Sequence, residues 1–143
     1  MTVPIWMLLA FATWTLLLLL STIGVYRWSR ILTRQSPINE FRADEIQGAD
    51  WYRRSMRAHA NCVENLPVFG AIVFALYVSQ LNSAAVSFLS IGVLVARVMQ
   101  SLVHICFPQT NTVAAIRFAF FFVQIVCFLA LIVLIVRHAT PTL

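Results

Sequence analysis

Three polar side chains with complementary chemistry are predicted to share one face of a helix. Arg57, Asn61 and Glu64 are spaced i, i+4 and i+7. At about 100° per residue, they fall within roughly 60° of one another. Arginine offers two parallel donors to a carboxylate, glutamate accepts from an amine, and an asparagine amide does either. The stripe therefore suits a zwitterionic ligand that bears a carboxylate, and the same groups also suit a polar network that joins helices.

A second polar stripe lies on a later apolar run, where Arg97, Gln100 and His104 are spaced i, i+3 and i+7. By the helix rise, Arg97 lies about 15 Å and Glu64 about 10 Å inside the membrane boundary. Because a charge at that depth needs a partner, we expect a structural ion pair between Glu64 and Arg97, within one subunit or between subunits. His104 and Arg117 are candidates for catalytic contacts at the same level. The alternative is an interfacial histidine and an arginine that snorkels to lipid phosphates.

The elements that position these stripes must be membrane-spanning helices. Of the 143 residues, 61% are hydrophobic and 10% are charged, whereas a soluble domain has about 25% charged residues. Four apolar runs are long enough to cross a hydrocarbon core of about 30 Å. We therefore predict an all-α, integral membrane four-helix bundle in a single domain. Its helices are expected at about 5–28, 50–81, 84–107 and 113–137, with a loop at about 29–49.

The connections and the arginines predict the arrangement of these helices. The links after residues 81 and 107 are short, which makes the later helices antiparallel neighbours. All ten basic residues are arginines, and seven of them lie between Arg27 and Arg57. The positive-inside rule then places the long loop in the cytoplasm and both termini outside, in a multi-pass protein of the cell inner membrane. Because the polar groups gather in one half, a channel through both halves is disfavoured.

The run around the first stripe carries a family resemblance. Residues 57–69 read Arg-Ala-His-Ala-Asn-Cys-Val-Glu-Asn-Leu-Pro-Val-Phe. This is similar to the RAHxNxxENxP signature of the MAPEG superfamily, the membrane-associated proteins of eicosanoid and glutathione metabolism. The resemblance extends to four helices, a long first loop and short later links. Within the superfamily, the chain resembles the bacterial branch and the microsomal glutathione transferases.

The resemblance implies a homotrimer that binds glutathione as a co-substrate between neighbouring subunits, near the cytoplasmic face. It implies glutathione contacts by six side chains, namely Arg57, Asn61, Glu64, His59, Arg30 and Arg34. The later helices depart from the family pattern, because His104 stands where several enzymes have a tyrosine that contacts glutathione. The arginine that follows this tyrosine in those enzymes has only a later counterpart here, Arg117.

These observations leave three functions open. The first is a glutathione-dependent transferase or peroxidase acting on lipophilic electrophiles, in which a fixed arginine raises the thiolate fraction of glutathione. The second is a non-catalytic membrane scaffold or lipid-binding protein of the same fold, and the third is a small transporter subunit.

The expected partners are further copies of the chain, membrane lipids and lipophilic small molecules. We expect no metal, nucleotide or nucleic acid, because the sequence lacks metal-ligand spacing and a glycine-rich phosphate loop.

Overall fold

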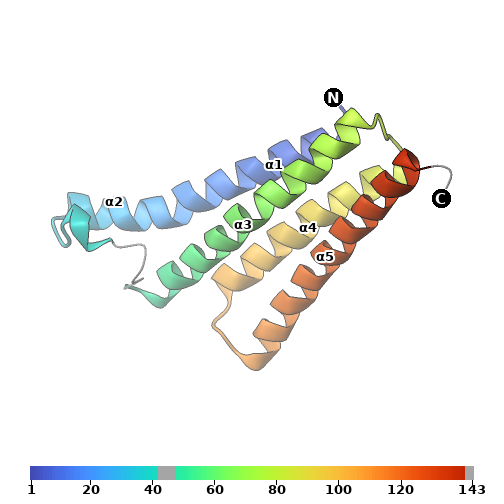
Figure 1. Cartoon of the computed structure of the whole chain (residues 1–143). Coiled ribbons are helices and arrows are strands. Elements are labelled where there is room, and N and C mark those ends of the chain that lie inside the picture. The colour runs from blue at the N-terminus through green and yellow to red at the C-terminus, as the bar shows by residue number, and fades with distance from the viewer. Residues whose placement is uncertain (42–47, 141–143) are drawn as a thin grey trace.

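The chain forms a bundle of four long helices, each long and apolar enough to cross a membrane (Figure 1). The structure is a computed structural model that describes residues 1–41 and 48–140, so residues 42–47 of the predicted loop lie outside the described residues. The prediction of an all-α membrane bundle is confirmed. The elements are α1 (Val3–Leu18), the π-helical segment η1 (Leu19–Gly24), α2 (Val25–Leu32), the short 3-10 helix η2 (Ile38–Glu40), α3 (Asp50–Val78), α4 (Ala84–Cys106) and α5 (Asn111–Ala139).

The two ends of the bundle differ. Both ends of the described chain lie together, beside the link between α3 and α4, and we name this the terminal end (Figure 1). The opposite end, which we name the loop end, carries α2, the start of α3 and the link between α4 and α5. The first span runs from Val3 to Leu32, so it reaches further toward the loop end than the expected stop near residue 28. The segment from Asp50 onward is one continuous helix with the apolar part of α3.

Side-chain caps determine where α4 and α5 begin. Ser83 Oγ accepts a hydrogen bond from the backbone N–H of Val86 at 3.3 Å. Thr110 Oγ1 accepts one from the backbone N–H of Val113 at 3.2 Å. Such caps satisfy a donor that the first helical turn leaves unpaired. The two short links therefore end in a hydroxyl residue placed directly before an apolar run.

Hydroxyl side chains accompany the π-helical segment in the first span. Ser21 and Thr22 lie within η1, and each donates its hydroxyl to a backbone carbonyl four residues earlier. Back-bonding of this kind is associated with bent helices, and it lets a polar residue satisfy itself inside a membrane. Beyond this segment the helix continues into α2, which brings Tyr26, Arg27 and Arg30 to the loop end.

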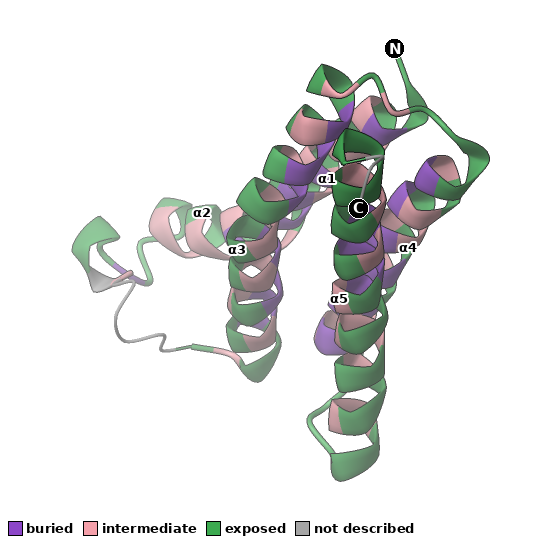
Figure 2. Cartoon of the chain, turned by 45° about the vertical axis from the view of Figure 1, so that its right-hand side comes forward, coloured by how far each residue is buried: buried purple, intermediate pink, exposed green. Residues whose placement is uncertain are grey.

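The core lies where the helices face one another, and exposed residues cover the outer faces (Figure 2). Three aromatic rings link α1, α3 and α5: Phe69 lies 6.0 Å from Phe11 and 6.0 Å from Phe128, measured between ring centroids. Between α4 and α5, a Cβ added at Gly92 would lie 3.2 Å from Cys127 Sγ, so these two helices pack closely. Close packing through small residues is how helices associate in lipid.

Candidate functional site

A cavity of about 250 Å³ lies toward the loop end between α3, α4 and α5, and we name it the loop-end pocket. Polar side chains from all three helices and aromatic rings from α5 line it. The lining residues are Asn61, Gln100, His104, Ala114, Arg117, Phe118 and Phe121. The two polar stripes predicted from the sequence therefore meet in one pocket, through one member of the first and two members of the second.

Helix periodicity explains this convergence. Gln100 and His104 are one turn apart on α4, and Arg117 and Phe121 are one turn apart on the antiparallel α5. Asn61 enters from α3, where its backbone carbonyl accepts a hydrogen bond from Asn65 Nδ2 at 2.8 Å. This bond uses the backbone of Asn61, and the Asn61 side chain lines the pocket.

The α4 wall of the pocket has polar atoms that the rest of the described chain does not satisfy. Gln100 is 7% exposed and His104 is 4% exposed. Gln100 Oε1 and His104 Nδ1 have no hydrogen-bond partner among the described residues. An unsatisfied buried polar group costs about 1–3 kcal/mol, so such groups call for an explanation.

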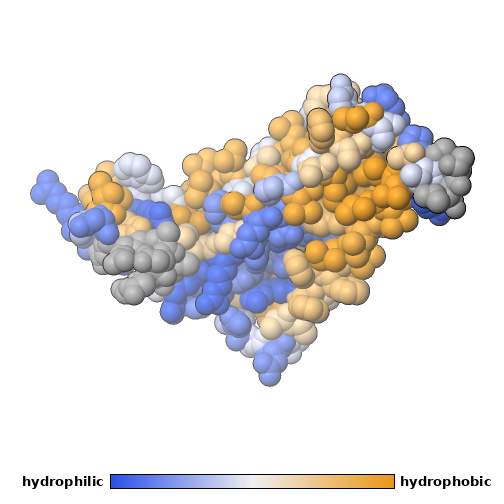
Figure 3. Space-filling view, viewed as in Figure 1, coloured by the Kyte–Doolittle hydropathy of each residue, from blue (hydrophilic) through white to orange (hydrophobic). Residues whose placement is uncertain are grey.

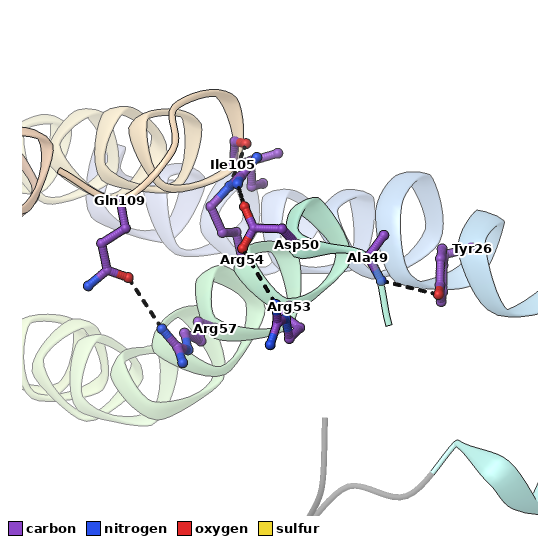
Figure 4. A network of polar contacts seen from close by, with 8 residues as sticks. All are labelled: Tyr26, Ala49, Asp50, Arg53, Arg54, Arg57, Ile105 and Gln109. Carbon is purple, nitrogen blue, oxygen red and sulfur yellow. Dashed lines mark hydrogen bonds and ion pairs between the residues drawn. The ribbon is translucent and has the colours of Figure 1, made fainter. Parts of the chain in front are cut away.

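A network of arginines stands at the loop end of α3, next to the pocket (Figure 4). Arg57 Nη1 donates to Gln109 Oε1 at 3.4 Å, and Arg54 Nε donates to the backbone carbonyl of Ile105 at 3.3 Å. Arg54 is also paired with the Asp50 carboxylate. These contacts join the start of α3 to the end of α4 and to the following link, one turn before the pocket-lining Asn61.

The charge around the pocket favours an anion. Arg117 lines the pocket, and Arg57 and Arg54 make their contacts at the loop end of α3, close to the pocket-lining Asn61 in sequence. The residues that line the pocket include one arginine and no carboxylate. Hydrophilic surface gathers over this part of the molecule, while the terminal half is mostly hydrophobic (Figure 3). Across residues 1–41 and 48–140, no three His, Cys, Asp or Glu side chains are placed to hold a metal ion.

A comparison with protein families bears directly on this four-helix arrangement. The model of the MAPEG family matches residues 4–137, which is nearly the whole chain. The chain belongs to the MAPEG family. The chain matches no curated protein and no solved structure. MAPEG proteins include glutathione transferases and peroxidases as well as non-catalytic members, so membership alone does not assign an activity.

In this MAPEG protein, Glu64 and Arg97 lie in different surroundings. Glu64 is exposed on α3 and does not line the loop-end pocket, whereas Arg97 is 1% exposed. The Arg97 guanidinium carbon lies 5.9 Å from the centre of the Phe11 ring, and its Nε and Nη2 atoms have no hydrogen-bond partner in the described chain. Between these two described residues there is no ion pair within one chain. Their pairing between subunits stays a prediction.

Three further residues that the family resemblance assigned to glutathione lie away from the pocket. Arg30 Nη1 donates to the Tyr26 hydroxyl and its Nε donates to Ser36 Oγ, each at 3.1 Å. Arg34 is exposed at the end of the first span, with a φ of 56°. His59 is half-buried and points about 200° around α3 from Arg57. In a single chain none of the three lines the pocket, so their contact with a ligand stays a prediction that requires a second copy.

The aromatic residues that line the pocket and the contact between Arg57 and Gln109 were not predicted from the sequence. Phe121 and Gln124 follow Arg117 at i+4 and i+7, so helix periodicity alone could have placed them on one face. Gln124 is fully buried, and both polar atoms of its amide are without a partner in the part of the chain described. Gln109 lies in a link, where no periodicity applies, and only the folded chain reveals its contact with Arg57.

Proposed function

We propose that the protein is a glutathione-dependent transferase or peroxidase that acts on lipophilic electrophiles. One observation carries the proposal: Asn61, from the signature run, and Arg117 line the same pocket. Asn61 of the signature is suited to bind a thiol tripeptide, and Arg117 of α5 is the cation of the pocket. A pocket that combines both has the parts that binding and activation of a thiol require.

The chemistry follows from the charges. Arg117 stabilises a thiolate over a thiol, because a nearby positive charge favours the anionic form. The thiolate sulfur then attacks the electrophilic carbon, a carbon–sulfur bond forms, and the leaving group departs with its electron pair. Phe118 and Phe121 give the electrophile an apolar surface. Arg57, next to the pocket mouth, suits a carboxylate of glutathione through paired charge-assisted hydrogen bonds.

The arrangement of copies and the orientation are part of the same proposal. We propose a homotrimer in which α2 of one copy, with the turn that follows it, brings Arg30 and Arg34 toward the loop-end pocket of the next. The loop end is proposed to face the cytoplasm of a cell with this protein in its inner membrane, because its arginines obey the positive-inside rule. Glutathione would then reach the pocket from the cytoplasm, and lipophilic electrophiles would enter sideways from the bilayer.

A titration of the purified protein with glutathione tests the proposal, with the thiolate absorbance band and turnover of an aryl halide or a lipid hydroperoxide as readouts. We expect a saturable thiolate band and turnover, both weakened at least about 10-fold in Asn61→Ala. Asn82→Ala, in the exposed link at the terminal end, is the matched control and should behave as the parent protein.

Other results, from this titration and from flux measurements, would favour the alternative functions. Saturable glutathione binding without a thiolate band or turnover would favour the non-catalytic scaffold or lipid-binding protein. Flux of solutes in proteoliposomes that does not depend on glutathione would favour the transporter subunit. Absence of glutathione binding in the parent protein would overturn the proposal.

A further inference from the structure

The contact between Arg57 and Gln109 joins α3 to the link between α4 and α5. Arg57 Nη1 lies 3.4 Å from Gln109 Oε1, across 52 positions of sequence. Arg57 comes from α3, one turn before Asn61 of the pocket, and Gln109 comes from the link between α4 and α5, before the pocket-lining Ala114. The pair therefore bridges two elements that both contribute to the pocket (Figure 4).

The partner of Arg57 is unlike the partner of its neighbour. Arg54, one turn earlier on α3, pairs with the carboxylate of Asp50 and with a backbone carbonyl of α4. Arg57 is exposed and meets only a neutral amide oxygen in the described chain. A neutral amide offers one oxygen and no negative charge, whereas a carboxylate offers two oxygens and forms an ion pair. The contact with Gln109 therefore fixes the position of the Arg57 guanidinium only weakly.

The link also holds Gln109 in place. Pro108 restricts the backbone on one side of it, because the proline ring fixes φ. Thr110 on the other side is fixed as the cap of α5 by its bond from Val113 N. Gln109 stands between two restrained residues, so its side chain reaches Arg57 from a backbone whose position is set by the fold.

We propose that Gln109 is a positioning residue, an internal competitor that holds the Arg57 guanidinium at the pocket mouth until a ligand carboxylate displaces it. The inference rests on the proposed function and adds a selection rule to it. A ligand carboxylate binds Arg57 more strongly than the Gln109 amide does, so it displaces Gln109. A neutral ligand group binds Arg57 no more strongly than the amide does, so the Arg57–Gln109 contact persists. The contact thereby discriminates by ligand charge, since affinity depends on the difference between the two partners.

The test replaces the weak competitor by a strong one. Gln109→Glu places a carboxylate opposite Arg57, so it should raise the Kd for glutathione about 4-fold. Asn82→Asp is the matched control, because Asn82 is exposed and directly precedes the cap of α4, as Gln109 directly precedes the cap of α5. We expect a change of less than about 2-fold there, since a charge about 30 Å from Arg57 by the helix rise is screened by salt. In an Arg57→Met background the two variants should give equal Kd values.

A second measurement, without ligand, separates this inference from the proposed function. Gln109→Glu should raise the Tm of the empty protein by about 3 °C over Asn82→Asp, and the gain should disappear in the Arg57→Met background. If the parent protein binds no glutathione but this gain in Tm appears, the Arg57–Gln109 contact is supported and the proposed function fails. If Gln109→Glu and Asn82→Asp give the same Kd and the same Tm, Gln109 is not a competitor for Arg57, whatever the parent protein binds.

Discussion

Arg27 on α2 donates from Nε to the hydroxyl of Tyr52 on α3 at 2.8 Å. Tyr52 is 2% exposed, and its ring stacks on that of Tyr26 with centroids 4.1 Å apart. The Tyr26 hydroxyl in turn accepts hydrogen bonds from Arg30 and from the backbone N–H of Ala49. One aromatic stack with two arginines thus fastens the first span to the start of α3, and so determines where Arg30 stands relative to the rest of the loop end.

The first prediction concerns this stack. Tyr52→Phe removes the hydroxyl that Arg27 bonds and leaves the stacked ring, so it should lower the free energy of unfolding by about 1–2 kcal/mol. Tyr77→Phe is the matched control, because Tyr77 lies on the same helix, is 59% exposed and makes no side-chain hydrogen bond in the described chain. Reversible unfolding in mixed micelles measures both. Equal losses in the two variants would contradict the role given to the Arg27–Tyr52 bond.

The second prediction concerns the packing of α4 on α5. Gly70→Ala, where nothing lies within 4 Å of the added Cβ, should stabilise the protein by about 0.5–1 kcal/mol through helix propensity. Gly92→Ala should lack this gain, because its Cβ would meet Cys127 Sγ at 3.2 Å. We expect the two unfolding free energies to differ by at least about 1 kcal/mol. Adding Cys127→Ala should reduce the penalty at position 92, and a purely additive double variant would argue against the close contact.

The fold was predictable from the sequence because the bilayer leaves few solutions. Apolar runs of spanning length must satisfy their backbone hydrogen bonds internally, so they become helices, and short links make neighbours antiparallel. Ser83 and Thr110, which cap α4 and α5, were not among the residues predicted from the sequence, although a hydroxyl residue before an apolar run is a signal for a helix start. The π-helical segment Leu19–Gly24 was not predictable, because hydroxyl residues with the same backbone contacts, Thr13 and Thr15, also lie in the regular helix α1.

The candidate site was predictable only in part. Periodicity placed Gln100 and His104 on one face of α4, and the pocket contains both. The same reasoning grouped Glu64 with Asn61, yet Glu64 remains on the exposed side of α3, since members of a stripe can fall on either side of a helix–helix contact. Which side each residue takes depends on the crossing of α3 with α4 and α5. Sequence spacing does not encode that crossing.

The third prediction concerns Arg97, a buried cation whose Nε and Nη2 atoms have no hydrogen-bond partner in the described chain. If Glu64 of a neighbouring subunit supplies the missing charge, Arg97→Leu should disrupt the assembly, because it strands a carboxylate at membrane depth. The double variant Arg97→Leu/Glu64→Leu removes both charges and should recover assembly. Native mass spectrometry from detergent reports the number of copies. A normal assembly in the single variant Arg97→Leu would exclude the pair.

The last prediction concerns Arg117, the one arginine among the residues that line the pocket. Replacing it with leucine keeps a shorter apolar side chain and removes the positive charge that favours a thiolate. We expect Arg117→Leu to lower kcat with an aryl halide about 10²-fold and to abolish the thiolate band, while glutathione binding falls much less. Arg137→Leu, on the same helix but exposed near the terminal end, is the matched control and should keep the parent kcat. If Arg117→Leu instead raised KM alone and left kcat and the thiolate band intact, Arg117 would bind glutathione at a distance from its sulfur, and another group would have to stabilise the thiolate.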